Sequence, residues 1–311
     1  MQDLLKELRA AGELTRLRIL LLLKDGELTV SEFVSILGQS QPRVSRHLRI
    51  LQEAGLIERH QEGTWAFFRR ARPEGKISLA AFAEDRVGEN DGQFIRDRDG
   101  LRTVRAERSA KAQAYFSAMA DTWNQIRALH VPEEDVEACL ISKIQGRSIE
   151  TMLDIGTGTG RMLQIFAPHI KEALGLDLSA DMLTVAGDML VAENITHARV
   201  RRGDMYDLPL KSGTQDLVVI HLVLHYADNP EAVIAEAARV LKRKGLLLIA
   251  DFAPHEEEFL REEHEHRRLG FADNEVSEWA LMAGLPLKSS DHLKGSPLTV
   301  AIWTFEKSQG P

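Results

Sequence analysis

A glycine-rich run near the middle of the chain carries the residues best suited to binding chemistry. It reads Asp-Ile-Gly-Thr-Gly-Thr-Gly over residues 154–160 and follows a short apolar stretch. The apolar stretch predicts a strand, and the glycines predict a tight turn where the backbone can approach a ligand before a helix starts. The next predicted strand, 173–177, ends in Asp177, whose carboxylate can accept both ribose hydroxyls of an adenosine. Because a glycine-rich turn alone is weak evidence, the following segments must decide.

Three further strands are predicted in the order of a parallel sheet. Ser179 caps a helix to about residue 192, and strand 198–202 leads into Asp204 and Met205. The aspartate can bond an adenine amino group, while the methionine packs on the ring. Strand 216–221, a helix over 229–241 and strand 246–251 follow. This alternation predicts an α/β doubly wound, Rossmann-like domain that binds ligands at the carboxyl ends of its strands.

Over about residues 149–306 these motifs resemble class I S-adenosyl-L-methionine (SAM) methyltransferases, closest in pattern to the quinone-biosynthesis type. The resemblance implies SAM as cofactor. By position, Asp154 and the loop 156–160 would hold the methionyl part, Asp177 the ribose, and Asp204 with Met205 the adenine. The cofactor-binding residues implied in this way are Asp154, Gly156, Thr157, Gly158, Gly160, Asp177, Leu178, Met182, Asp204, Met205 and His221.

Methyl transfer from a sulfonium requires an in-line nucleophile and exclusion of water, and it requires a general base only when the acceptor arrives protonated. The titratable groups near the ends of the last two strands are His221, His225, Tyr226 and Asp251. We take His221 and Asp251 as the catalytic candidates, with a structural role equally open for both. In this pattern His225 is more often a structural or cofactor-side contact than a base.

The histidines near residue 260 do not predict a metal site. His255, His264 and His266 lie among six glutamates, but the spacing of the last two places them on different sides of a helix. We therefore expect a solvated acidic helix here and no bound metal. The single cysteine, Cys139, excludes a disulfide framework and the usual cysteine-rich zinc sites, and it argues against thiolate-dependent arsenite methylation.

The first 75 residues are slightly basic, whereas the whole chain has a net charge of −8. Amphipathic patterns predict helices over 14–24, 30–37 and 41–54, with Gly38 ending the second and Ser40 capping the third. Two β-prone runs then surround Glu62-Gly63, a suitable hairpin turn. Helix, helix, basic helix and hairpin is the order of an α+β winged helix-turn-helix domain.

The third helix has the character of a recognition helix. Val44, Leu48 and Leu51 form an apolar stripe, and Arg46 lies nearly opposite, with Arg43 and Arg49 beside it. Such a face fits the major groove of DNA. A solvated basic face is the alternative, which the order of the surrounding elements disfavours. The candidate DNA-binding residues are Ser40, Gln41, Arg43, Ser45, Arg46, His47 and Arg49.

The strings Leu-Thr-Arg-Leu-Arg-Ile-Leu at 14–20 and Ser-Gln-Pro-Arg-Val-Ser-Arg-His-Leu at 40–48 resemble the ArsR/SmtB family of dimeric repressors. The resemblance covers about the first quarter of the chain and implies a homodimer on a near-palindromic operator, released by an effector. Arsenic sensors of this family carry a string like Glu-Leu-Cys-Val-Cys. Here Thr29 and Ser31 stand at the cysteine positions, so we do not expect thiolate metal sensing.

The connecting segment is helix-prone. A helix over 77–86 is a candidate dimer helix, and apparent helix breakers at 90–92 and 97–100 predict a flexible boundary near 88–100. A second helix over 101–129 carries an aromatic stripe, which we expect to pack on the next domain or, as an alternative, to cover the cofactor. The stripe comprises Tyr115, Phe116, Met119 and Trp123. We place the domains at 1–88, 89–148 and 149–311.

These features predict a DNA-binding regulator of ArsR type that carries a SAM-dependent methyltransferase domain for a small-molecule acceptor. The alternative is a non-catalytic sensor in which SAM or S-adenosylhomocysteine controls operator affinity. A DNA methyltransferase is disfavoured, because no Asn/Asp-Pro-Pro-Tyr/Phe-type string follows strand 216–221 and the catalytic half is acidic. The expected partners are double-stranded operator DNA and the acceptor. Without a long apolar run or a secretion signal, we expect a soluble cytoplasmic protein and no membrane partner.

Overall fold

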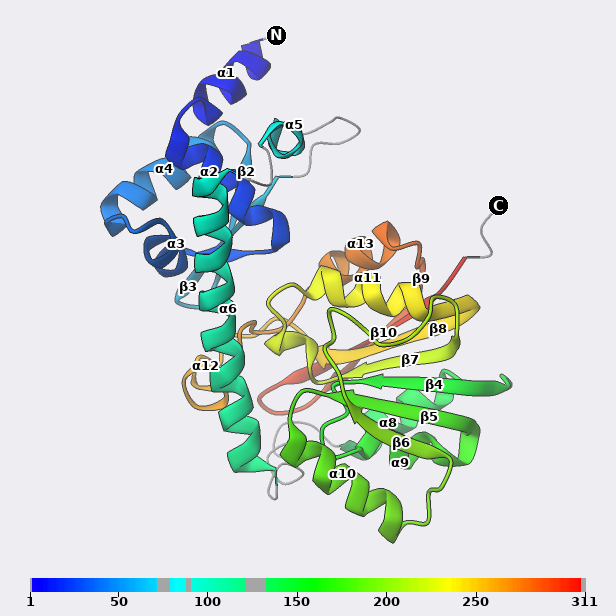
Figure 1. Ribbon diagram of the computed structural model, residues 1–311. Helices are drawn as coiled ribbons and strands as arrows, with labels where there is room; N and C mark the ends of the chain where they lie inside the picture. The colour runs from blue at the N-terminus through cyan, green and yellow to red at the C-terminus, as the bar shows by residue number, and fades with distance from the viewer. Residues whose placement is uncertain (1, 72–78, 88–90, 121–132, 309–311) are drawn as a thin grey trace. The chain divides into compact units, whose positions relative to one another are not determined.

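A seven-stranded sheet forms the centre of the C-terminal part of the chain. The computed structural model describes residues 2–71, 79–87, 91–120 and 133–308, and the chain divides into two units, residues 1–110 and 111–311. Figure 1 shows the course of the chain through its helices and strands. Within the described residues, no helix is long and apolar enough to cross a membrane.

The first unit has the helices and the small sheet of a winged helix-turn-helix domain. Its strands pair antiparallel in the order β1-β3-β2, and β2 and β3 form the predicted hairpin. The fold predicted for this part is therefore confirmed. In chain order its elements are α1 (Gln2–Ala11), α2 (Leu14–Leu22), η1 (Leu23–Asp25), β1 (Leu28–Thr29), α3 (Val30–Leu37), α4 (Gln41–Glu53), β2 (Ile57–Glu62), β3 (Trp65–Arg70), α5 (Leu79–Arg86) and the first part of α6 (Gly92–Met119).

Local signals explain where α3 and α4 begin and end. Thr29 accepts a hydrogen bond from the backbone N–H of Glu32, whose side chain accepts one from the backbone of Thr29. This capping box starts α3, and Gly38 ends it in the left-handed conformation at φ 64°. Ser40 occupies the N-cap position of α4 as predicted, but its side chain makes no capping hydrogen bond, and Pro42 lies in the first turn. The predicted stripe of Val44, Leu48 and Leu51 is buried in the core of the unit, as an amphipathic helix requires.

The predicted interruption of the helix at residues 97–100 is wrong. These residues lie inside α6, which runs without interruption for 28 residues. The buried carboxylate of Asp97 accepts two 2.7 Å hydrogen bonds from the guanidinium of Arg18, so its polar side chain serves tertiary pairing rather than a turn. A Cβ at Gly100 would lie 3.3 Å from the Ile36 side chain, so helix packing explains the small residue. The end of the predicted helix 101–129, with Trp123, and residues 77–78 lie outside the described residues.

The second unit contains the expected doubly wound sheet. Its strands follow the order β6-β5-β4-β7-β8-β10-β9; the first five are parallel, and β10 is antiparallel to both neighbours. The five predicted strands are found, and β10 and β9 extend the sheet beyond them. The strands are β4 (Ile149–Ile155), β5 (Ile170–Asp177), β6 (Ala198–Arg202), β7 (Gln215–His221), β8 (Leu241–Phe252), β9 (Leu287–Lys294) and β10 (Thr299–Glu306).

Helices cover both faces of this sheet, and each face has its own apolar core (Figure 1). Helices α11 and α13 pack on one face, and α8 and α9 pack on the other. The sheet edges are basic: β6 exposes Arg199, Arg201 and Arg202, and β9 exposes Lys288 and Lys294. The helical elements are α8 (Glu133–Ser142), α9 (Arg161–Phe166), η2 (Ala167–His169), α10 (Ala180–Ala192), η3 (Leu224–Tyr226), α11 (Pro230–Val240), α12 (Phe259–His264) and α13 (Asp273–Met282).

The Arg18–Asp97 ion pair provides a test of the first unit. Replacing Asp97 with Ala leaves a largely buried guanidinium unpaired, so we expect the free energy of unfolding to fall by about 2–4 kcal/mol. Asp99→Ala is the matched control two positions along the same helix, because Asp99 pairs with Arg102 on the surface. Its loss should stay within about 1 kcal/mol. Equal losses in urea titrations of the two variants would contradict a structural role for the pair.

Candidate functional site

The loop between β4 and α9 is built from glycines in left-handed backbone conformations. Gly156, Gly158 and Gly160 have φ values of 70°, 51° and 85°. The N–H groups of Gly156 and Thr157 both donate to the carbonyl oxygen of Leu176, at 2.8 and 2.9 Å. The Thr157 hydroxyl donates to the buried carboxylate of Asp154 at 2.6 Å. The loop is therefore bound to β5, and at the glycines no side chain covers its backbone.

The loop after β4 also meets the loop after β7. Because β5 and β7 flank β4 on opposite sides, the sheet order brings these two loops together at the carboxyl ends of the strands. At Gly156 a Cβ would lie 2.5 Å from Cγ2 and 2.8 Å from Cβ of Val223. Val223 is stiff, since its branching lies at Cβ. Only glycine satisfies both the backbone angle and this close approach.

Asp177 joins the glycine loop to the start of α10. Its Oδ2 accepts a hydrogen bond from the N–H of Gly158 and its Oδ1 accepts one from Ser179, both at 2.9 Å. Burial raises the pKa of Asp177, although these backbone N–H groups oppose the shift. The hydroxyl of Ser179 accepts from the N–H of Met182, which caps α10 as predicted. Leu178 is partly buried beside Asp177, and Met182 is buried.

The third loop at this end follows β6. Asp204 is exposed and accepts a hydrogen bond from the N–H of Tyr206 at 2.9 Å, while Met205 is partly buried against the core. The Tyr206 hydroxyl accepts from the N–H groups of Asp228 and Asn229, at 2.7 and 3.1 Å. This contact connects the loop after β6 to the one after β7.

The two catalytic candidates lie in different surroundings. His221 is the last residue of β7 and is partly buried. Asp251 is fully buried near the end of β8. Its Oδ1 accepts from Nδ1 of His225 at 2.7 Å and from the N–H of Phe252 at 2.8 Å, and its Oδ2 accepts from the N–H of His225 at 3.2 Å. Asp251 thus pairs with His225, which sequence reasoning had set aside as a structural or cofactor-side contact.

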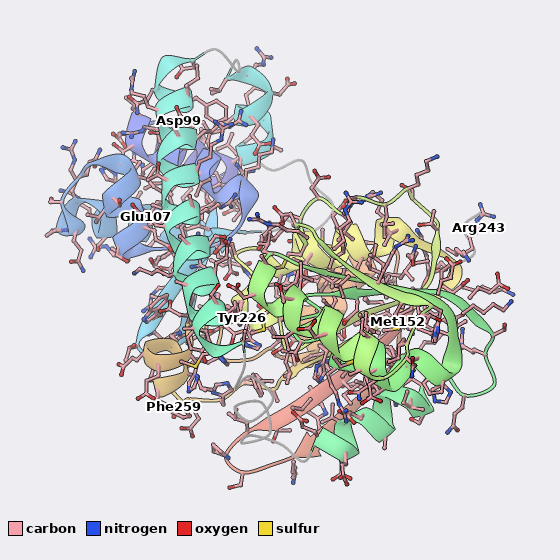
Figure 2. All side chains as sticks on the ribbon, turned by 60° about the horizontal axis from the view of Figure 1, so that its bottom comes forward. Asp99, Glu107, Met152, Tyr226, Arg243 and Phe259 are labelled. Atoms are coloured by element: carbon pink, nitrogen blue, oxygen red, sulfur yellow. The ribbon has the colours of Figure 1, made fainter. Side chains whose placement is uncertain are left out.

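Aromatic and imidazole rings surround this pair. The ring of His225 stacks on His266 at a centroid distance of 4.1 Å and contacts Tyr226 at 4.1 Å and Phe252 at 5.2 Å. Tyr226 of η3 contacts His225 directly, whereas Phe259 of α12 contacts His264, whose ring lies 6.4 Å from that of His266; Tyr226 and Phe259 are labelled in Figure 2. Burial raises the pKa of Tyr226 well above its ordinary value, so its phenol stays protonated at neutral pH.

The end of α6 contributes to the same cluster. Phe116 packs edge-to-face on Tyr226 at 4.9 Å, and the Tyr115 hydroxyl lies 2.6 Å from Nδ1 of His264. Burial, with a smaller effect from Glu265, raises the pKa of Tyr115 to about 12. The predicted packing of the aromatic stripe is therefore found for Tyr115 and Phe116.

The predicted acidic helix around residue 260 is present as α12, and its Glu262 and Glu263 are exposed, but the segment that follows it is buried. Helix α12 is only six residues long, and Glu265 ends it in the left-handed conformation. The chain then turns inward, where the backbone N–H groups of Arg267 and Arg268 donate to the carbonyl oxygen of His225. His266 is buried as a result. Across the described residues, no group of three or more His, Cys, Asp or Glu side chains is arranged to hold a metal ion.

In the first unit, α4 presents most of the candidate DNA-binding residues to solvent. The exposed ones are Ser40, Gln41, Arg43, Ser45, Arg46 and Arg49. His47 differs, because it is partly buried and its Nδ1 lies 3.5 Å from Oε2 of Glu13. Burial lowers the pKa of His47; the charge of Glu13 opposes this shift, and Arg16, Arg43 and Arg46 add to it. It therefore contributes a neutral ring rather than a positive charge to this face.

The two positions at which arsenic sensors carry cysteines serve folding here. Thr29 caps α3, and its hydroxyl lies 3.0 Å from that of Ser31. Hydroxyls in a helix cap provide no soft ligand for a thiophilic metal.

Two family models match separate parts of the chain. One described as a methyltransferase domain matches residues 153–249, and one described as a bacterial regulatory protein of the arsR family matches residues 14–59. The uncharacterized methyltransferase YcgJ of Bacillus subtilis is 27% identical over 148 residues, which cover 46% of this chain and 58% of that protein. The arsenical resistance operon repressor of Escherichia coli is 48% identical over 56 residues, which cover 18% of this chain and 48% of the repressor.

The crystal structure of the Bacillus YcgJ protein superposes with a TM-score of 0.50 at 18% sequence identity, covering 57% of this chain and 100% of that one. At this identity the likeness concerns the fold alone. The chain spans about half the length of the curated relatives it matches.

The close approach at Gly156 predicts the effect of adding one methyl group. Gly156→Ala combines a left-handed backbone, which costs an L-residue about 1–2 kcal/mol, with a clash worth about 1–3 kcal/mol. Gly213→Ala is the matched control, because Gly213 has the same φ of 70° and open space around its missing Cβ. Urea unfolding should show the larger loss for Gly156→Ala, and Val223→Ala should restore part of it. Equal losses at both glycines would contradict the clash.

Proposed function

Since the N-terminal part of the chain belongs to the arsR family of bacterial regulatory proteins and the C-terminal part is a methyltransferase domain, we propose that the protein is a transcriptional regulator that also transfers a methyl group from SAM to a small-molecule acceptor. The observation that carries this proposal is the Asp177 carboxylate, held between the glycine loop and α10 at the end of β5.

The methyltransferase fold implies SAM binding, and the residues at this end of the sheet fit that cofactor. Each oxygen of Asp177 accepts one backbone N–H group. An ionised carboxylate has about four lone-pair sites, so acceptor capacity is left for two ribose hydroxyls. The glycine loop exposes backbone without side chains, on which the methionyl part could lie, beside the buried Asp154. Asp204 and Met205 lie in the loop after the neighbouring strand β6, where the adenine would lie.

When bound, SAM supplies an electrophilic methyl group on a sulfonium. The chain has to orient this group, position the acceptor and exclude water. The proximity of the loops after β4 and β7 serves orientation, since Gly156 and Val223 leave no space between them. The aromatic cluster that includes Tyr226 supplies an apolar environment at the same carboxyl ends of the strands.

We propose that α4 reads double-stranded operator DNA as part of a homodimer. The exposed basic face of α4 supports the DNA contact. On α1, Leu4, Leu5 and Leu8 are 54%, 47% and 46% exposed. An apolar helix face of this kind favours burial against a second copy. A two-fold pair of recognition helices would match a near-palindromic site.

One observation favours regulation by the ligand of the second unit. Helix α6 contributes residues to both units: Arg108 pairs with Glu32 of α3 in the first, and Tyr115 bonds His264 in the second. A helix shared in this way allows ligand binding to change operator affinity. Linkage then requires DNA to change ligand affinity by the same factor.

Arg46 provides the test of DNA binding. If its guanidinium contacts a base edge, Arg46→Ala should weaken binding to the protein's own promoter fragment by about 1–3 kcal/mol, measured by fluorescence anisotropy at fixed salt. Arg102→Ala on α6 is a control of equal charge change and should bind as the wild type does. Sedimentation velocity on the same samples checks the dimer, and repeating the titration with S-adenosylhomocysteine checks the coupling. Unchanged affinity and salt dependence would remove Arg46 from the interface.

Asp177 provides the test of cofactor binding. An ionised carboxylate accepts hydrogen bonds from the ribose hydroxyls more strongly than a carboxylic acid does, so affinity for S-adenosylhomocysteine should rise as pH increases through the raised pKa of Asp177 and level off above it. Asp177→Asn should remove this pH dependence and weaken binding at neutral pH by about tenfold to a hundredfold, the value of hydrogen bonds to a charged group. Calorimetry measures both effects, with Asp181→Asn, exposed on α10, as the control. Wild-type affinity in Asp177→Asn would refute the ribose assignment.

A further inference from the structure

Hydrogen bonds fix both the ring and the backbone of His225. Nδ1 and the backbone N–H both bond to the carboxylate of Asp251, and the backbone carbonyl oxygen accepts from Arg267 and Arg268. The side chain is also almost fully buried, with 2% of its surface exposed. The bond to Asp251 on β8 and the burial fix the orientation of the ring, while the bonds from Arg267 and Arg268 fix the backbone of the residue.

This orientation determines what the other ring nitrogen can do. The carboxylate of Asp251 only accepts, so Nδ1 carries the proton and Nε2 of the neutral ring presents a lone pair. Nε2 is buried and has no hydrogen-bond partner within the described part of the chain. A buried acceptor without a donor is unfavourable, and in a native structure it requires an explanation.

The surroundings indicate which kind of donor is missing. Phe252, Tyr226 and His266 contact the His225 ring, and Phe116 packs on Tyr226. Flat rings of this kind bind flat apolar molecules through stacked and edge-to-face contacts. Val223, which lies against Gly156 of the glycine loop, is two residues before His225. Nε2 of His225 thus lies at the same end of the parallel strands as the proposed cofactor site.

We propose that Nε2 of His225 removes the proton of the methyl acceptor, that Asp251 is its positioning residue, and that the acceptor is a flat aromatic molecule with an ionisable hydroxyl. This inference rests on the proposed methyltransferase function. In the step, the O–H bond breaks, its proton goes to Nε2, and its electron pair forms the O–CH₃ bond. The S–CH₃ bond breaks and its pair stays on sulfur, giving neutral S-adenosylhomocysteine. Asp251 remains ionised and stabilises the imidazolium.

The neighbouring groups are compatible with this role. Tyr226 stays a neutral phenol because burial raises its pKa. The guanidinium groups of Arg267 and Arg268 pair with Asp228 and Glu275, at 3.4 and 2.9 Å. His266 is the other titratable ring in direct contact with His225.

The purely structural alternative is a staple, in which the His225–Asp251 pair only fixes η3 against β8. A measurement on the nitrogen itself separates the two roles. Full-length protein labelled with ¹⁵N-histidine and saturated with S-adenosylhomocysteine is titrated with 7-hydroxycoumarin, a flat phenol, and with 7-methoxycoumarin, which lacks the hydroxyl proton. The Nε2 resonance is assigned by its loss in His225→Gln or, if that variant does not fold, by through-bond correlation to the backbone.

We expect the hydroxyl compound to move the Nε2 resonance toward that of a protonated nitrogen and the methoxy compound to leave it in place. Absence of movement, or equal movement with both compounds, would establish the staple and overturn the inference alone. Failure of the wild type to bind S-adenosylhomocysteine in calorimetry would overturn the proposed function, and this inference with it.

Kinetics supply a second readout. With 7-hydroxycoumarin as acceptor, His225→Gln should lower kcat by about 10²–10⁴-fold, the usual range for a general base, with little change in KM. Asp251→Asn should lower kcat as well, because it removes the fixed tautomer. His292→Gln on β9 is the matched control, since His292 is exposed and pairs with Asp273. A rise in KM at unchanged kcat would make His225 a binding group and contradict a role in proton transfer.

Discussion

The close approach of the loops that follow β4 and β7 is the constraint on which the site depends. Strand order places β4 between β5 and β7. The chain therefore goes from β4 to β5 and β6 on one side of it and then crosses to β7 on the other side. At that crossing the Gly156 backbone lies directly against Val223. The glycine loop, the Asp177 carboxylate and His225 then lie together at the carboxyl ends of the parallel strands. None of these groups is close to the others in sequence, and the topology alone brings them together.

Features governed by neighbouring residues could be predicted from the sequence. Ser179 caps α10, Gly38 ends α3, and Val44, Leu48 and Leu51 are buried as the helical period requires. Each of these rests on backbone geometry or periodicity within a few residues. The glycine spacing and the acid at the end of the next strand likewise indicated the glycine turn after β4 and the place of Asp177 at the end of β5.

Features that depend on distant partners could not be predicted. Asp97 and Gly100 resemble helix breakers, but Arg18 and Ile36 give them tertiary roles. The glutamates near residue 260 indicated the exposed helix that is found, but no local signal indicated that the backbone N–H groups of Arg267 and Arg268 donate to the carbonyl oxygen of His225. The pairing of His225 with Asp251 arises because β7 and β8 are neighbours in the sheet, and no local signal in the sequence announces it. A histidine just past the end of one strand and an acid near the end of its neighbour would be the pattern to seek.

The basic edges of the sheet have a consequence for how copies of the chain associate. An edge strand leaves a row of unpaired N–H and C=O groups that can capture a strand from another molecule. Here Arg199, Arg201 and Arg202 line β6, and Lys288 and Lys294 lie on β9. Two such edges would bring like charges together, which opposes growth of the sheet from one molecule into the next. The charges on both edge strands therefore oppose edge-to-edge association of the sheets as the concentration of the protein rises.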